Sequence, residues 1–196
     1  MDEGGVALHS KKGRKNRVTF VFEDESGYSE RPTVRRTWAP KGHTPIIRST
    51  GSWKNRTAIG MLACDYRGKK PRLLLRILRA SARSPDFVTT LKHLRRHVRG
   101  KVFLLWDGLG GHWSKEVRAH ICAHRSWLTV FRFPAYAPEL NPAEGIWSAS
   151  KTKDFANFCP KDVSELEEQI KKSRARIQRH PDILSGCLKE SGLFDC

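Results

Sequence analysis

The sequence predicts a single α/β domain in which helices pack on a mixed β-sheet. One observation is a series of β-branched, aromatic and leucine-rich runs within the first 80 residues, each bounded by turn residues. The other is the alternation of helix-like and strand-like segments from residue 84 onward. Antiparallel strands followed by helix–strand units are typical of a mixed sheet with helices packed on it. A chain of 196 residues fits one such domain.

Four strands are expected before residue 80. Gly27 and Pro32 break the chain after the first of them, and the segment 65–68 has the composition of a hairpin connection. The expected strands cover residues 17–23, 34–38, 57–66 and 72–78.

Helices and strands alternate in the rest of the chain. Ser84 is a good N-cap with Pro85 at the first helical position, and Gly100 marks the end of that helix. The segment 101–106 is apolar after its first residue, which predicts a central strand. A second strand is expected over 127–133. Further helices are expected from Ser114 to about 124, over about 144–155, and from about 162 onward.

Composition divides the chain into three parts. Residues 1–16 contain glycines and a basic cluster that cannot build a core, so we expect a disordered basic arm or linker remnant. Residues 17–180 form the predicted domain, and 181–196 are expected to be a C-terminal tail. No apolar run is long enough to span a bilayer and no secretory signal is visible, so we expect a cytoplasmic protein without membrane contact. Five cysteines without a C-x-x-C pair are interpreted as free thiols.

The formal net charge of +17 is concentrated in the first half of the chain. Residues 1–100 carry 23 Lys and Arg against 8 Asp and Glu, whereas residues 101–196 carry 14 against 12. Such asymmetry is typical of a surface that binds a phosphate backbone. Four cations share one face of the helix after Ser84, and they either contact nucleic acid or form a solvated surface. They are Lys92, Arg95, Arg96 and Arg99.

Three acidic residues have distinctive surroundings. Asp24 and Asp107 each follow an apolar run expected to be a buried strand, and Glu144 stands at the expected start of a helix. If the two strands are neighbours, the three carboxylates converge, and their repulsion is relieved by divalent cations. Oxygen ligands without a histidine or cysteine cluster favour two Mg²⁺ or Mn²⁺ ions about 4 Å apart.

Each carboxylate also has a purely structural interpretation. Asp24 could belong to an acidic turn, Asp107 could be a turn residue before Gly108, and Glu144 could favour the positive end of a helix dipole. The joint occurrence of the three residues within their flanking motifs favours the metal site.

Those motifs resemble the catalytic domain of DDE transposases of the mariner superfamily, in particular the bacterial insertion sequence 630 group. The likeness covers about residues 17–180, and a proline-aromatic turn that leads to Asn141, Pro142 and Glu144 is its most specific part. The matching segments are 22–28, 36–42, 104–108 with His112, and 134–144 with Trp147.

The resemblance implies a ribonuclease-H-like fold with Asp24, Asp107 and Glu144 as catalytic, metal-binding residues. The 36 residues between the last two are close to the usual family spacing. Glu25 is not expected to be a ligand, because neighbouring strand residues point to opposite sides of a sheet. Asn141 and His112 are expected to support the active site. His112 would lie near the metals or the scissile phosphate, or have a structural role.

The resemblance further implies metal-dependent DNA strand cleavage at transposon ends, followed by strand transfer into target DNA, usually at a TA dinucleotide. The expected partner is therefore DNA, bound at the nucleoid, and synapsis of two ends suggests a homodimer. Full-length relatives carry an N-terminal helix-turn-helix region, and none fits within residues 1–16. We expect that region to be absent, with a separately encoded helix-turn-helix subunit as one possible source.

Two other functions remain open at the sequence level. One is a stand-alone structure-specific nuclease on the same fold, which would cleave without transposon-end sequence. The other is a non-catalytic or truncated transposase remnant that acts as a DNA-binding or regulatory protein. Both predict different behaviour from a transposase toward inverted-repeat DNA.

Overall fold

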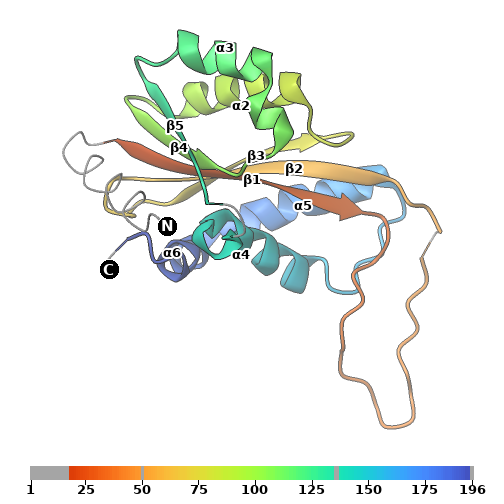
Figure 1. Cartoon of the computed structure of the whole chain (residues 1–196). Coiled ribbons are helices and arrows are strands. Elements are labelled where there is room, and N and C mark those ends of the chain that lie inside the picture. Colours follow the sequence, from red (N-terminus) through yellow and green to blue (C-terminus); the bar gives the residue numbers. More distant parts are fainter. Residues whose placement is uncertain (1–17, 50, 135–136, 195–196) are drawn as a thin grey trace.

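A computed structural model describes residues 18–49, 51–134 and 137–194 of the chain (Figure 1). Its centre is a five-stranded sheet with the order β3-β2-β1-β4-β5. β2 is antiparallel to β1 and β3, and β4 is parallel to β1 and β5. The strands are β1 (Thr19–Ser29), β2 (Asn55–Cys64), β3 (Arg72–Leu78), β4 (Val102–Trp106) and β5 (Leu128–Arg132). The mixed sheet predicted from the sequence is confirmed.

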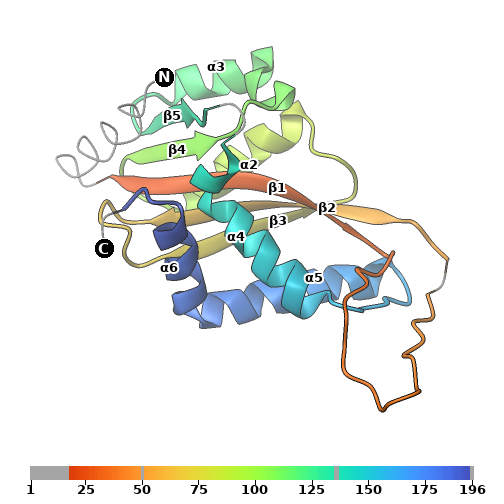
Figure 2. The ribbon, with the colours of Figure 1, turned by 60° about the horizontal axis from the view of Figure 1, so that its bottom comes forward.

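Helices cover both faces of this sheet. Figure 1 shows α2 and α3 on one face, and Figure 2 shows α4, α5 and α6 together on the other. The α-helices are α2 (Ser84–His97), α3 (Lys115–Ala123), α4 (Pro142–Ala149), α5 (Val163–Arg179) and α6 (Pro181–Glu190). Short 3-10 segments η1 (Gly110–Trp113) and η2 (Pro138–Leu140) and a π-helical turn η3 (Ser150–Asp154) complete the elements.

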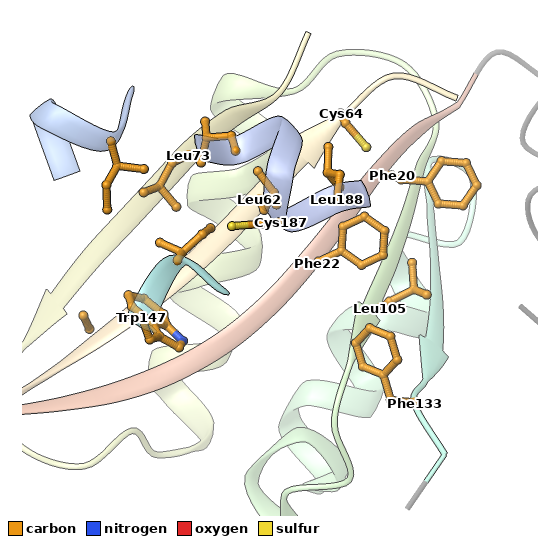
Figure 3. Close-up of a cluster of buried hydrophobic side chains, with 14 of the residues drawn as sticks. Phe20, Phe22, Leu62, Cys64, Leu73, Leu105, Phe133, Trp147, Cys187 and Leu188 are labelled. Carbon is orange, nitrogen blue, oxygen red and sulfur yellow. The ribbon is translucent and has the colours of Figure 1, made fainter. Parts of the chain in front are cut away.

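Alternation along the strands builds two separate cores. In β1, Phe20 and Phe22 pack toward α4 and α6, whereas Val21 packs toward α2. Figure 3 shows the first core, in which Phe20 and Phe22 of β1 lie beside Leu188 of α6, and Trp147 of α4 belongs to the same cluster. Because both faces are buried along β4 and along the first part of β1, β4 and residues 20–22 of β1 are apolar, as expected for central strands.

β1 is longer than the sequence predicts. The expected strand ended at residue 23, but β1 continues to Ser29, since β2 pairs with it as far as Ser29 and Asn55. Pairing with β4 stops earlier, at Phe22 and Leu105. Asp24 therefore lies inside a strand, not at its end, just beyond the point where β1 loses its neighbour β4. The acidic residues concealed this extension because they are uncommon in strands.

The prediction of a strand over residues 34–38 is wrong. This part of the chain lies in an irregular segment that projects away from the sheet between β1 and β2 (Figure 1), and it makes one isolated bridge, between Thr33 and Ala156. Val34 is 72% exposed and Trp38 is 100% exposed. The alternating pattern of this segment therefore has no adjacent strand to pair with, and a strand requires a ladder partner.

Other predicted boundaries differ by small amounts. Arg83 is the N-cap of α2 and Ser84 its first residue, because the Asp86 carboxylate accepts a hydrogen bond from the Arg83 N–H at 3.0 Å. The helix expected over 144–155 begins two residues earlier and continues as the π-helical turn. The hairpin connection is confirmed, with the Gly68 N–H bonded to the Asp65 carbonyl at 2.9 Å.

The expected C-terminal tail begins with a helix. Pro181 stands at the start of α6, and Leu184, Cys187 and Leu188 are buried against the domain. The apolar stripe of this ten-residue helix was too short to be recognised in the sequence.

Residues 1–16, expected to be a disordered basic arm, lie outside the described residues. Within the described residues, no helix is both long and apolar enough to cross a membrane. Cys64, Cys122, Cys159 and Cys187 are free thiols.

Candidate active site

Asp24 lies on the sheet face that α4 covers. Its backbone pairs with Gly60 of β2, and the Trp147 indole of α4 packs over that glycine (Figure 3). The indole Nε1 donates a hydrogen bond to Asp24 Oδ2 at 2.8 Å. A Cβ on Gly60 would lie 2.5 Å from the Trp147 ring, so the glycine provides the space through which the indole reaches the carboxylate.

The Asp24 carboxyl is in an environment that disfavours its charge. Burial raises its pKa most, the nearby Glu144 carboxylate raises it further, and the Trp147 hydrogen bond lowers it, with a net value of about 7. A carboxyl that is repelled by a neighbouring carboxylate is stabilised in its ionised form by a bound cation. The charge balance at this position therefore fits a metal ligand.

Glu144 is brought to Asp24 by the way α4 begins. Asn141 is the N-cap, and its Oδ1 accepts a hydrogen bond from the Ala143 N–H at 3.1 Å. Its Nδ2 donates to the backbone carbonyl of Glu23 at 3.4 Å. The capping side chain thus ties the first turn of α4 to β1 beside Asp24. Asn141 supports the geometry of the site by this route.

Asp107 reaches the same edge of the sheet from β4. Asp24 and Asp107 each lie two residues beyond Phe22 and Leu105, the last pair of the parallel β1–β4 ladder. The Asp107 Oδ1 accepts a hydrogen bond from the Leu109 N–H at 2.8 Å. Parallel register therefore brings the two carboxylates to equivalent positions on adjacent strands.

His112 lies beneath Asp107 in a fully buried position. Its Nδ1 is 3.0 Å from Asp107 Oδ1, and its Nε2 is 3.3 Å from oxygens of both Glu23 and Glu25. These two glutamates point to the α2 face of β1, opposite to Asp24, as strand alternation predicts. The interpretation of Glu25 as pointing away from Asp24 therefore agrees with the structure.

The buried histidine and glutamates form a charge-paired cluster. Burial disfavours the imidazolium of His112, but hydrogen bonds to Glu23 and Glu25 outweigh that effect and hold its pKa well above the usual range. Burial likewise raises the pKa of Glu23, while the bond to His112 opposes it. A protonated His112 carries a proton on both ring nitrogens, with Nδ1 facing Asp107 and Nε2 facing Glu23 and Glu25.

Comparison with known proteins places this constellation in a family. The sequence profile of the DDE superfamily endonucleases matches residues 19–167. The chain belongs to this family. No curated protein sequence matches it significantly.

Solved structures similar to this DDE endonuclease include several of the Mos1 mariner transposase. The Mos1 paired-end complex with the left transposon end has a TM-score of 0.63 at 14% identity, over 98% of this chain and 61% of that chain. The isolated Mos1 catalytic domain has a TM-score of 0.56 at 13% identity, over 97% of this chain and 92% of that one.

This likeness shows a shared fold. The five-stranded mixed sheet flanked by helices is the ribonuclease-H-like fold of the Mos1 catalytic domain, as the sequence predicted. The chain spans 61% of the length of the transposase in the paired-end complex, so activities of the whole transposase are matters of proposal for this endonuclease. Other Mos1 catalytic-domain structures hold Mg or Mn together with raltegravir.

The DDE endonuclease offers two sets of residues for a divalent ion. Asp24 and Glu144 supply oxygen donors that repel each other, and Asp107 extends from the adjacent strand. Glu23, Glu25 and His112 offer ligand atoms within 4.8 Å of one another. The first set fits Mg²⁺ or Mn²⁺ better, because Asp24 and Glu144 have no ion-pair partner among the described residues, whereas His112 lies 3.3 Å from both Glu23 and Glu25.

The predicted cationic face of α2 is exposed. Lys92, Arg95, Arg96 and Arg99 all reach solvent. The Arg95 guanidinium lies 4.8 Å from the centre of the Trp127 ring and donates to the Gly100 carbonyl at 3.0 Å. These contacts hold the Arg95 side chain, while Lys92 and Arg96 lie exposed on α2 and Arg99 lies just beyond its end at His97.

Sequence reasoning missed several residues of the site. Trp147 was noted only as part of a motif, although a residue three positions after Glu144 lies on the same helix face. Gly60 gave a weak signal as a glycine inside a strand pattern. The contact between the Arg132 guanidinium and Gly108, beside Asp107, had no sequence signal, because it joins the ends of two strands that are distant in the chain.

Proposed function

We propose that this DDE endonuclease is a transposase catalytic domain of the insertion sequence 630 group. It would cleave DNA strands at transposon ends and join the freed 3′-hydroxyl to target DNA. The observation that supports this best is the convergence of Asp24 with Glu144 on the α4 face of β1, at the edge that Asp107 reaches from β4. DNA bound in the nucleoid of the cytoplasm is the proposed substrate.

In this proposal Asp24, Asp107 and Glu144 hold two divalent ions, Mg²⁺ or Mn²⁺. The bound ions would activate the attacking oxygen and stabilise the leaving oxygen of an in-line displacement at phosphorus. Trp147 orients Asp24 through Oδ2, and Asn141 holds the helix that carries Glu144. The same residues serve hydrolysis and strand transfer, because water and a DNA hydroxyl are equivalent nucleophiles for this site.

Cleavage of labelled oligonucleotides in Mg²⁺ tests this proposal. Duplexes that carry the inverted repeats flanking the chain's own gene are compared with scrambled duplexes. We expect nicking at the repeat ends, and a loss of at least about 10³-fold in Asp107→Ala. Asp182→Asn, at an exposed position in the first turn of α6, is the matched control and should cleave normally. Equal nicking of scrambled DNA would instead indicate a stand-alone nuclease. Nicking that survives Asp107→Ala would refute the assigned residues.

The cationic face of α2 is proposed to contact the DNA backbone. If Arg95 and Arg96 each neutralise a phosphate, replacing both with alanine should reduce the slope of log K against log salt by about 1–2. The control is the double alanine variant at Lys171 and Lys172 on α5, which lies on the opposite face of the sheet. An unchanged slope in the Arg95 and Arg96 variant would show that this face is only solvated.

A homodimer and a separately encoded helix-turn-helix subunit are proposed partners for the whole reaction. Synapsis requires two transposon ends in one complex, which is simplest with two catalytic domains. Sedimentation of the chain with paired-end DNA should show two protomers per complex. One protomer on a cleaved end would refute the dimer.

A further inference from the structure

The cluster of Glu23, Glu25 and His112 contacts the proposed metal site through His112 Nδ1, which lies 3.0 Å from Asp107 Oδ1 and 3.4 Å from the Asp107 backbone carbonyl. We propose that His112, supported by Glu23 and Glu25, is a positioning residue that fixes the Asp107 carboxylate for metal binding. The inference rests on the proposed function, in which Asp107 is a metal ligand. In this proposal, Glu23 and Glu25 hold the His112 ring from the middle of β1.

The His112 ring is held rigidly. It stacks on Trp106 with ring centres 4.2 Å apart and an angle of 4°, and the edge of Phe87 meets it at 4.3 Å. A Cβ on Gly111 would lie 2.6 Å from Phe87, so a glycine there allows η1 to close against α2. These two aromatic contacts hold the imidazole with Nδ1 toward Asp107 and Nε2 toward Glu23 and Glu25 of β1.

The side-chain contacts of Asp107 fall on one carboxylate oxygen. Oδ1 accepts a hydrogen bond from the Leu109 N–H at 2.8 Å and lies 3.0 Å from His112 Nδ1, which is also 3.4 Å from the Asp107 backbone carbonyl. One hydrogen bond and one charge contact on Oδ1 favour a single rotation of the carboxylate and leave Oδ2 to face a cation. Such outer-shell hydrogen bonds orient metal ligands in proteins, and their loss commonly weakens metal affinity 10–100-fold.

The glutamates hold the other side of the ring. Glu23 and Glu25 both place an oxygen 3.3 Å from Nε2, and Glu23 is fully buried. Among the described residues, both Glu23 oxygens, Glu25 Oε1 and His112 Nε2 lack a partner that meets strict hydrogen-bond geometry, so the contact between the ring and the glutamates is one of charge. With Nε2 facing these carboxylates, Nδ1 faces Asp107.

Metal affinity and amide exchange together test the positioning role. His112→Ala removes both donors, whereas His112→Asn keeps a side-chain amide near the Nδ1 position. We expect Mn²⁺ binding, measured by calorimetry, to weaken about 10-fold in His112→Ala and to return to within about threefold in His112→Asn. In the metal-free protein, NMR should show faster solvent exchange of the Leu109 amide in His112→Ala only. His180→Ala, on an exposed helix boundary, is the matched control.

Each outcome decides the inference. A folded His112→Ala that binds Mn²⁺ like the parent and leaves Leu109 exchange unchanged would overturn it. So would Mn²⁺ binding that survives Asp24→Ala but vanishes in His112→Ala, because the cluster would then be a metal site itself. If His112→Ala does not fold, Glu25→Gln replaces it, with an expected weakening of about threefold, and an unchanged affinity would overturn the inference.

The test separates this inference from the proposed function. A parent protein that binds no Mn²⁺ would refute the metal site, and Leu109 exchange in the metal-free variants would then decide the positioning role alone. Normal Mn²⁺ binding by the parent with no response to any His112 variant would refute the positioning role and leave the proposed function intact.

Discussion

The two faces of β1 treat neighbouring carboxylates in opposite ways. On the α4 face, Asp24 is repelled by Glu144 and held by one neutral donor, the Trp147 indole. On the α2 face, Glu23 and Glu25 share the buried imidazole of His112. Three consecutive acidic residues thus alternate between a face that leaves charge uncompensated and a face that neutralises it.

This difference distinguishes the proposed metal site on the α4 face from the cluster of Glu23, Glu25 and His112 that supports it on the α2 face. Uncompensated carboxylates disfavour the metal-free fold and gain most from a cation, whereas compensated ones stabilise the fold and fix geometry. The α4 face should therefore respond to metal and pH, and the α2 face should respond to loss of its histidine.

The largest expected change in stability comes from removing the histidine on the α2 face of β1. His112→Leu leaves two buried carboxylates without a cationic partner, so we expect the free energy of unfolding at pH 8 to fall by about 3 kcal/mol. Urea denaturation measures this change, with His180→Leu as a control near zero. Adding Glu23→Leu should recover part of the loss. A His112→Leu variant as stable as the parent would show that the imidazole compensates nothing.

The next effect comes from the uncompensated face. The pKa of Asp24 rises from 3.8 to about 7 on folding, so metal-free stability falls as the pH rises through that window. Asp24→Asn should therefore raise the free energy of unfolding by about 2 kcal/mol at pH 8 and by little below pH 4. Denaturation in EDTA tests this, and saturating Mn²⁺ should stabilise only the parent. Equal stability of parent and variant at pH 8 would contradict the repulsion.

A smaller effect tests the space that Trp147 needs. Gly60→Ala places a methyl group 2.5 Å from the indole, and we expect a cost of about 1–2 kcal/mol from this overpacking. Gly27→Ala, on the paired strand, has no heavy atom within 4 Å of its added Cβ and serves as the control. Thermal unfolding compares the two. Similar melting temperatures for both variants would mean that the indole shifts without cost.

The smallest effect is a change of pKa. Glu144 raises the pKa of Asp24 second only to burial, so Glu144→Gln should lower that pKa below about 7. Carbon-13 NMR of the aspartate carboxyls measures it directly. Trp147→Phe should move the same pKa upward, because it removes the donor that favours the carboxylate. If the pKa of Asp24 were the same in Glu144→Gln as in the parent, the two carboxylates would be too far apart to repel each other.

Much of the architecture could be predicted from the sequence. The apolar run before Asp107 identified a central strand, and strand alternation separated Asp24 from Glu25. Residue pairs such as Trp147 with Asp24, and His112 with Glu23, could not be predicted in this way. They join distant segments through side-chain packing, which local patterns do not encode.

The errors have related causes. Acidic residues hid the end of β1, since local propensity disfavours them in strands while pairing with β2 extends the ladder to Ser29. The segment 34–38 has strand-like residues without a strand beside it. In both places the deciding factor was the presence or absence of a tertiary partner.

Anomalous diffraction from crystals soaked in Mn²⁺ tests the central claim most directly. We expect manganese peaks between Asp24, Asp107 and Glu144, on the α4 side of β1, and their loss in Asp24→Asn. Peaks among Glu23, Glu25 and His112, with none at the triad, would contradict it.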